Sequence, residues 1–314
     1  MNLSEIGFYT LSDERAKGSS SNSPLYRGEL ILSSRCNFKC PYCRSVGGPD
    51  IPMAKARTIV NIWGDNGLRN VRFLGGEPTL YPGLVELVAL AKERRIRRVA
   101  LSTNGSATAE LYRKLLAAGV DDFSISLDAC CSEDGDKMSG GRKGILEVVV
   151  ENIKWLAKQA YVTVGIVLTS DNVARAEEII RFADSLGVSD IRVIPVAQEG
   201  CELPAICVDA ELLQKYPILK YREQNFRDRR PVRGNPVKKC GLVLDDMAVM
   251  GFEHYPCIIY MREGGAPIGQ LNPQMRLKRA EWYAEHDCTQ DHICAKNCLD
   301  VCVDYNRKFA EYHC

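Results

Sequence analysis

The segment Glu29-Leu-Ile-Leu-Ser-Ser-Arg-Cys36-Asn-Phe-Lys-Cys40-Pro-Tyr-Cys43 places an apolar strand directly before three closely spaced cysteines. An iron–sulfur cube normally takes four protein thiolates, so a cube held by three leaves one iron open to another ligand. A structural zinc site would need a fourth Cys or His, and neither occurs between Cys43 and Cys130. A disulfide framework suits small secreted chains rather than one of 314 residues. The spacing therefore predicts a cluster whose open iron binds a further molecule.

Strand-like and helix-like segments alternate from about residue 29 to residue 196, which predicts a parallel sheet covered by helices. The expected strands, rich in Val, Ile, Leu and Phe, are Glu29–Ser33, Val71–Leu74, Arg98–Thr103, Asp122–Leu127, Val162–Thr169 and Asp190–Pro195. The expected helices are Ala54–Trp63, Gly83–Glu93, Ala107–Ala118, Ile145–Gln159 and Ala174–Leu186. Gly119 and Gly187 directly follow two of these helices, where a left-handed cap is typical. Six such units predict an incomplete α/β barrel.

Polar and glycine-rich motifs stand at the ends of the expected strands. Cys36 follows the first strand, and the next three are followed by Gly75-Gly76-Glu77-Pro78, Ser102-Thr103-Asn104 and Ser126-Leu127-Asp128. Barrel enzymes build their active sites from the loops at the carboxyl ends of their strands, so we expect all four motifs on one rim. A Ser or Asn taken singly is more often an ordinary loop residue, and the shared rim is what favours a binding role.

The Cys36-x3-Cys40-x2-Cys43 and Gly75-Gly76-Glu77 motifs together resemble the signature of the radical S-adenosylmethionine (radical SAM) superfamily. The resemblance implies a partial (β/α)6 TIM-like barrel, a [4Fe-4S] cluster on the three cysteines, and S-adenosylmethionine on the open iron. Cleavage of that cofactor would give a 5′-deoxyadenosyl radical that abstracts hydrogen from a substrate. The cofactor-binding residues so implied are Tyr42, Gly75, Gly76, Glu77, Ser102, Asn104, Ser126 and Asp128. For Tyr42, plain packing is an equal alternative.

The last quarter of the chain contains a second group of cysteines: Cys240, Cys257, Cys288, Cys294, Cys298, Cys302 and Cys314. The group resembles the auxiliary-cluster extension called SPASM, or its shortened twitch relative, which implies a C-terminal cysteine-rich domain with one or two auxiliary [4Fe-4S] clusters. In the SPASM pattern a C-x2-C pair opens the second part, whereas Glu285 stands three positions before Cys288 here. The resemblance favours a first cluster on Cys240, Cys257, Cys294 and Cys298, and leaves Cys288, Cys302 and Cys314 for a second. A zinc knuckle is the alternative.

Cys130 and Cys131 closely follow the fourth expected strand, on the catalytic rim. Radical epimerases that resemble this architecture return a hydrogen atom to a carbon radical from such a thiol, so both are candidate catalytic residues. A buried or idle thiol is the competing interpretation.

The motifs and the predicted elements together divide the chain into four parts: an N-terminal extension (1–28), the barrel (29–200), a basic bridge (201–239) and the auxiliary-cluster domain (240–314).

Composition limits the partners that we expect. The chain has 41 basic and 40 acidic side chains, so it lacks the net positive field that drives nonspecific nucleic-acid binding. No apolar run approaches the roughly 20 residues needed to span a bilayer, so no membrane association is expected. Fourteen cysteines suit cluster ligands in a reducing compartment, which predicts a cytoplasmic enzyme.

SPASM and twitch enzymes act on ribosomal peptides, on sugars and aminocyclitols, and on protein side chains. We expect maturation of a ribosomally synthesised peptide, by backbone excision, epimerisation or crosslinking, with an external electron donor. The opening Gly7-Phe-Tyr-Thr-Leu-Ser-Asp13 resembles that of peptide spliceases. The first expected strand begins near Glu29, so leader capture is expected to need a separate partner protein. The alternatives are an epimerase or dehydrogenase of a small aminoglycoside or polyol, and an electron-carrying iron–sulfur protein.

Overall fold

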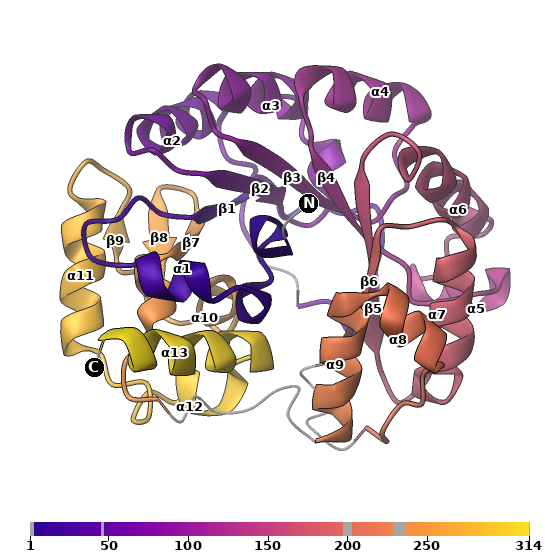
Figure 1. The fold of residues 1–314 in the computed structure, drawn as a ribbon. Helices are drawn as coiled ribbons and strands as arrows, with labels where there is room; N and C mark the ends of the chain where they lie inside the picture. The colour runs from indigo at the N-terminus through magenta and orange to yellow at the C-terminus, as the bar shows by residue number, and fades with distance from the viewer. Residues whose placement is uncertain (1–2, 45–46, 197–202, 229–236, 314) are drawn as a thin grey trace.

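The computed structural model describes residues 3–44, 47–196, 203–228 and 237–313, which are built around a nine-stranded sheet (Figure 1). The strand order is β6-β5-β4-β3-β2-β1-β7-β8-β9. The first six strands are β1 (Arg27–Ile31), β2 (Asn70–Leu74), β3 (Arg98–Thr103), β4 (Asp122–Ser126), β5 (Tyr161–Leu168) and β6 (Asp190–Pro195). Each pairs in parallel with the next. The predicted six-stranded parallel sheet of a partial TIM-like barrel is therefore confirmed.

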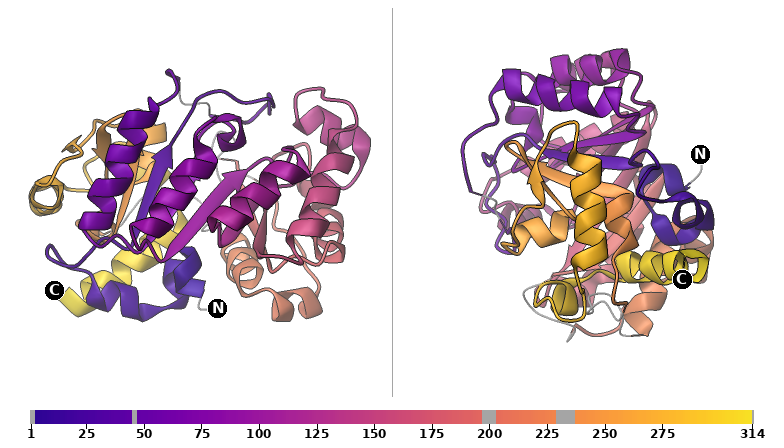
Figure 2. Two further views of the ribbon diagram at one scale, coloured as in Figure 1. Left: turned by 90° about the horizontal axis from the view of Figure 1, so that it is seen from above. Right: turned by 90° about the vertical axis from the view of Figure 1, so that its left-hand side faces the viewer.

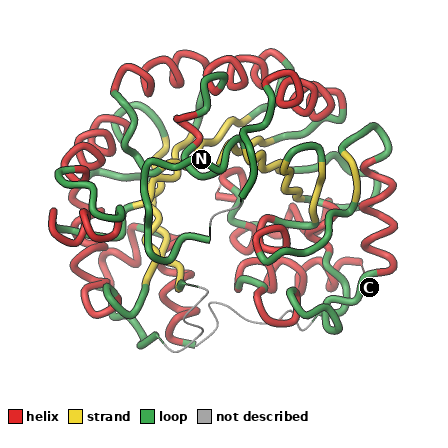
Figure 3. Tube along the Cα trace, turned by 180° about the vertical axis from the view of Figure 1, so that it is seen from behind, coloured by secondary structure: helices red, strands yellow, loops and turns green. Residues whose placement is uncertain are grey.

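Helices surround the barrel strands on the outside (Figure 3). The predicted ones are α2 (Met53–Asp65), α3 (Leu84–Glu93), α4 (Ala109–Ala118), α6 (Ile145–Leu156) and α7 (Ala176–Ser185). Their buried residues recur at helical spacing, as Ala56, Ile59, Val60 and Trp63 do in α2. Gly119 ends α4 in the left-handed conformation, with φ of 111°. An additional helix, α5 (Ser132–Met138), occupies the segment after β4.

Short 3-10 turns complete the N-terminal part and the barrel loops: η1 (Leu3–Ile6), η2 (Tyr9–Leu11), η3 (Pro78–Leu80) and η4 (Val173–Arg175). None of the helices in the described ranges is both long and apolar enough to cross a bilayer.

The C-terminal unit continues the barrel sheet instead of forming a sheet of its own. β7 (Asp246–Met250) pairs in parallel with β1, and β8 (Glu253–Tyr255) and β9 (Gly269–Gln270) extend it antiparallel. The other elements are η6 (Gly241–Leu244), α10 (Ile258–Arg262), α11 (Met275–Glu285), α12 (Cys294–Asn297) and α13 (Asp300–His313). Helix α1 (Asp13–Gly18) packs against α13, so the first and last described helices lie side by side (Figure 2).

Arg279 holds the C-terminal unit together from inside. Its side chain is fully buried. It donates to the backbone carbonyl oxygens of Val243 (2.8 Å), Tyr255 (3.0 Å), Pro256 (3.2 Å) and Asp246. A buried guanidinium is stable only where its donors are satisfied. Arg279 therefore fixes α11 to the η6–β7–β8 segment, which is flanked by Cys240 and Cys257.

The described part of the predicted basic bridge is largely helical. It forms α8 (Ala210–Lys215) and α9 (Pro217–Arg227), and α9 packs against β6. Arg222 of α9 is buried and forms an ion pair with Asp300 of α13, and Asn225 Nδ2 donates to the same carboxylate at 2.6 Å. Helix α9 thus connects the last barrel strand with the C-terminal unit, and Arg222 is a structural contact.

Candidate active site

A cavity of about 450 Å³ is lined by the carboxyl ends of the barrel strands and their loops. Most of the residues predicted for the rim lie on its wall: Cys36, Cys40, Cys43, Tyr42, Gly75, Gly76, Ser102, Asn104, Ser126 and Asp128. The fold thus gathers the four rim motifs at one place. Among the residues predicted for the rim, Glu77, Cys130 and Cys131 do not line this cavity.

Gly75 and Gly76 lie directly against the backbone that leads into the cysteine loop. A Cβ on Gly75 would stand 2.4 Å from the carbonyl oxygen of Ser33, and one on Gly76 would stand 2.3 Å from that of Arg35. Gly76 N donates to Ser33 O at 2.7 Å, and Glu77 N donates to Arg35 O at 2.8 Å. Only glycine permits this approach, so the two glycines fix where the cysteine loop begins.

Glu77 is fully buried and holds two rim loops together. Its carboxylate accepts hydrogen bonds from Thr79 N (3.0 Å), Thr79 Oγ1 (2.7 Å), Thr103 Oγ1 (2.7 Å) and Asn104 N (2.7 Å). Burial raises the pKa of Glu77, while these donors act in the opposite direction. In this structure the motif's carboxylate therefore supports the site from behind the cavity wall.

Asn104 connects the β3 loop with the cysteine loop. Its Nδ2 donates to Asn37 Oδ1 at 2.8 Å and lies 3.9 Å from Cys36 Sγ, while its Oδ1 accepts from Ser106 N at 3.0 Å. An amide held beside a ligand sulfur is a typical support of a metal-bound thiolate. Asn104 therefore contacts Cys36, one of the predicted cluster ligands.

The half-buried Tyr42 and the buried Asp128 form a pair on the cavity wall. The Tyr42 hydroxyl donates to Asp128 Oδ2, and Val167 N donates to Asp128 Oδ1 at 2.5 Å. Burial raises the pKa of Asp128 to about 6, and burial followed by the charge of Asp128 also raises the pKa of Tyr42. The pair anchors the cysteine loop to the end of β4.

The three N-terminal cysteines fit a [4Fe-4S] cluster. They line one cavity, and Cys43 N donates to Cys40 O at 3.0 Å in a tight turn. Burial, followed by the charge of Asp128, raises the pKa of Cys40 to about 12, and burial also raises the pKa of Cys36. A raised pKa disfavours the thiolate form that binds metal. Cys36 and Cys40 therefore need nearby positive charge to ionise, which the iron of a bound cluster would provide. When bound, such a cluster supplies the electron for cleavage of S-adenosylmethionine.

Sequence reasoning missed the arginines of the cavity, which are Arg44, Arg72, Arg192 and Arg262. The Nε atoms of Arg72 and Arg192 have no hydrogen-bond partner among the described residues. Burial, followed by the charge of Arg72, lowers the pKa of Arg192 to about 9. A signal was present, because Arg72 and Arg192 interrupt apolar strands at positions that a barrel should bury. The cavity therefore favours a bound anionic group.

Cys130 and Cys131 lie outside the cavity lining and contact Arg175. Arg175 Nη2 is 3.1 Å from Cys130 Sγ, and Arg175 Nη1 is 3.7 Å from Cys131 Sγ. Cys131 Sγ also donates to Asp134 Oδ2 at 3.2 Å. Their role as hydrogen donors stays a prediction, and this placement favours the idle-thiol interpretation.

The C-terminal cysteines gather around a second, small cavity of about 30 Å³, which is lined by Cys240, Cys257, Cys294, Cys298 and Cys302. Cys288 is fully buried, and its thiol interacts with those of Cys240 and Cys294. The predicted ligand Cys314 lies outside the described residues. Thiols that are far apart in the sequence thus meet at one place, as the auxiliary-cluster prediction requires, although their assignment to individual clusters stays a prediction.

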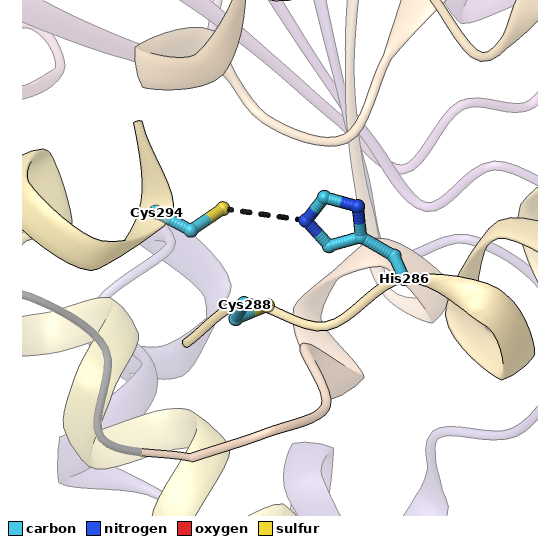
Figure 4. Close-up of side chains that lie close together, drawn as sticks. All are labelled: His286, Cys288 and Cys294. Atoms are coloured by element: carbon cyan, nitrogen blue, oxygen red, sulfur yellow. Dashed lines mark hydrogen bonds between the residues drawn. The ribbon is translucent and has the colours of Figure 1, made fainter. Parts of the chain in front are cut away.

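His286 is a further candidate ligand that sequence reasoning missed. The ligand atoms of His286, Cys288 and Cys294 all lie within 4.8 Å of one another, and Cys294 Sγ is 3.8 Å from His286 Nε2 (Figure 4). The available signal was the spacing His286-x-Cys288-x5-Cys294 in a cysteine-rich segment.

Comparison with known proteins identifies the barrel. The profile of the radical SAM superfamily matches residues 30–183. A relative from Saccharolobus islandicus, named "Probable GTP 3′,8-cyclase", is 30% identical over 219 residues, which cover 66% of this chain and 70% of that protein. The first curated relatives all carry this name, and the chain spans between 56% and 70% of their length.

Two solved structures have a similar fold over nearly the whole chain. Streptococcus suis SuiB bound to precursor peptide SuiA has a TM-score of 0.60 at 16% identity, covering 88% of this chain and 68% of that one. Native anSMEcpe with bound AdoMet and Cp18Cys peptide has a TM-score of 0.59 at 16% identity, covering 92% and 96%. At these identities the likeness concerns the fold alone.

Proposed function

Because this chain belongs to the radical SAM superfamily, we propose that it generates a 5′-deoxyadenosyl radical and abstracts hydrogen from a ribosomally synthesised peptide during its maturation. Backbone excision, epimerisation and crosslinking are the reaction types proposed. A [4Fe-4S] cluster on Cys36, Cys40 and Cys43, S-adenosylmethionine and one or two auxiliary clusters are the cofactors. The proposal includes a separate leader-binding protein, an external electron donor and a cytoplasmic location.

The observation that carries the proposal is the position of the C-terminal unit at the cavity. Ile258, Ile259 and Arg262 of α10 line the cavity directly after Cys257, and Asn297 and Leu299 line it on either side of Cys298. Ile259 also lines the small cavity between the C-terminal cysteines. A substrate bound over the rim would thus lie within one layer of side chains of an auxiliary cluster, which suits electron transfer from a substrate radical.

The fold neighbours support a peptide as the substrate. The two solved structures described above hold peptides, and their likeness extends over 88% and 92% of this chain, hence beyond the barrel. The alignments to the cyclase relatives cover 54–66% of the chain.

A nucleotide substrate is the second candidate, and the arginines of the cavity favour it. Arg44, Arg72, Arg192 and Arg262 outnumber the carboxylates Glu29 and Asp128 on the wall. Arg44 forms an ion pair with Glu263, and the remaining guanidiniums suit a phosphate chain or an acidic peptide side chain. The positive charge of these arginines would repel a polycationic aminoglycoside, whereas an uncharged polyol could still bind in the cavity.

One incubation separates these substrates. The anaerobically reconstituted enzyme is mixed with S-adenosylmethionine, a reductant, and either GTP or a candidate substrate peptide, such as one encoded near its gene, in heavy water. A peptide that gains one deuteron, loses two hydrogens or loses a residue-sized fragment supports maturation by epimerisation, crosslinking or excision. A cyclised nucleotide with an unchanged peptide, in the presence of a leader-binding protein, would replace the first proposal with the second. A Cys40→Ala variant controls for reactions that do not need the cluster.

A further inference from the structure

The C-terminal unit contains a histidine beside two cysteines, away from the large cavity. The imidazole of His286 faces the thiol of Cys294, and Cys288 lies next to both (Figure 4). We propose that His286, Cys288 and Cys294 bind one divalent ion of the zinc class, separately from any iron–sulfur cube. We refer to these three residues as the His286 site.

The distances between the ligand atoms are compatible with a single ion. In a tetrahedral zinc site, metal–ligand bonds of about 2.0–2.3 Å place the ligand atoms about 3.3–3.8 Å from one another. The three ligand atoms here lie within 4.8 Å of one another, and His286 Nε2 and Cys294 Sγ are 3.8 Å apart. Cys298 and Cys302 are also in hydrogen-bonding contact, so the feature that distinguishes the His286 site is its imidazole, which is a typical zinc ligand and an uncommon ligand of a cube. The three ligand atoms would have to approach one another by no more than about 1–1.5 Å to coordinate one ion.

The imidazole is held in place by aromatic side chains. The ring of His286 stacks on Trp282, with the centroids 3.9 Å apart and the planes at 16°. Tyr260 meets the same ring edge-on, with the centroids 6.1 Å apart. Since α11 supplies Trp282 and α10 supplies Tyr260, two helices fix the orientation of the ring before any ion binds. Such positioning by neighbouring groups is typical of metal-binding histidines.

The backbone around the His286 site is fixed in the same way. Lys239 Nζ donates to His286 O at 3.0 Å, and Cys288 N donates to Lys238 O at 2.9 Å. Cys294 N donates to Asp291 Oδ1 at 2.8 Å. Each of the three ligand residues is therefore tethered by a hydrogen bond at its own main chain, which limits the entropy lost when an ion binds.

The donor set agrees with the proposed ion. Two thiolates and one imidazole are soft to borderline ligands, which select zinc over magnesium or calcium. The carboxylate of Asp291 lies close as well, since its Oδ2 is 3.8 Å from His286 Nε2 and accepts from the Tyr260 hydroxyl at 3.0 Å. It lies on the side of the nitrogen that faces Cys294, where it can complete the coordination of the ion.

The assignment changes which cysteines are left for iron. Cys240, Cys257, Cys298 and Cys302 remain on the wall of the small cavity, and four thiolates complete one cube. Cys294 thereby moves to the zinc ion and Cys302 takes its place among the iron ligands. With the cluster on the N-terminal cysteines, the chain would hold about eight irons and one zinc.

Metal analysis and zinc-edge X-ray absorption of the anaerobically purified protein test the proposal. The expected result is about one zinc per chain, with sulfur at about 2.3 Å and imidazole nitrogen at about 2.0–2.1 Å. His286→Ala should lose most of the zinc and keep its iron. His292→Ala is the matched control, because this exposed histidine lies in the same loop, and it should keep both metals.

Three results would overturn the assignment. Protein produced with iron and zinc both supplied could contain less than a tenth of a zinc per chain. The zinc spectrum could show four sulfurs and no imidazole. His286→Ala could lose about four irons instead of zinc, which would make His286 a ligand of a cube. The spectrum of the unaltered protein decides the matter even if the variant fails to fold.

Discussion

Replacing Gly76 with alanine should displace the cysteine loop without touching a cysteine. The added Cβ would stand 2.3 Å from Arg35 O and 2.6 Å from Ser34 O, and both are backbone atoms that cannot rotate away. The backbone must move, which strains the hydrogen bond from Gly76 N to Ser33 O and the one from Glu77 N to Arg35 O. Overpacking costs about 1–3 kcal/mol and a displaced hydrogen bond about 1 kcal/mol, so we expect a loss of about 2–4 kcal/mol.

The assay combines anaerobic urea denaturation with iron analysis and S-adenosylmethionine binding. Gly76→Ala should lower the free energy of unfolding by this amount and weaken cofactor binding, because Cys36 directly follows the displaced residues. Gly47→Ala is the matched control, since that glycine follows the same cysteine loop and an added Cβ there would meet no atom within 4 Å. If the two variants agree within about 0.5 kcal/mol and bind the cofactor equally, the proposed role of the close approach is wrong.

Three further predictions concern the pH dependence, the C-terminal unit and the thiols near the rim. Burial raises the pKa of Asp128 from 3.8 to about 6, so the folded state retains a proton that the unfolded state releases. Stability should therefore fall as pH rises from about 4 to 6, by up to about 3 kcal/mol relative to Asp128→Asn, and parallel urea titrations of the two proteins would reveal the difference. Arg279→Met leaves buried carbonyl oxygens without donors and should cost about 3–5 kcal/mol in thermal or urea unfolding, so a loss below 1 kcal/mol would contradict the anchoring role. Cys130→Ala and Cys131→Ala should keep full turnover, because both thiols contact Arg175 outside the cavity lining. Loss of product with continued S-adenosylmethionine cleavage in either variant would restore the hydrogen-donor role.

The barrel could be predicted closely because its signals are local. The strands Arg98–Thr103 and Asp122–Ser126 are apolar runs, and turn or cap residues mark where the intervening helix ends. The predicted and observed boundaries differ by no more than three residues across the barrel, and the largest difference is at the end of α6. The motifs at the rim were predictable for the same reason, since their place relative to a strand end is a matter of sequence distance.

Contacts between distant segments could not be predicted in this way. The pairing of β7 with β1 depends on which exposed strand edge the C-terminal unit meets, and strand propensity does not encode a partner. The support that Glu77 gives to Thr103 and Asn104 likewise depends on the approach of two loops. The resemblance implied that Glu77 binds the cofactor, and this role stays a prediction, whereas the burial of Glu77 between the two loops is visible only in the folded structure.

The sequence by itself determined the superfamily, the parallel barrel and the three-cysteine loop, because each rests on short-range spacing or on periodic burial. Only the tertiary structure brought Arg72 and Arg192 to one cavity and His286 beside Cys294. Those arrangements arise when separate elements pack, and the energy that selects one packing is shared among many contacts that no single motif carries.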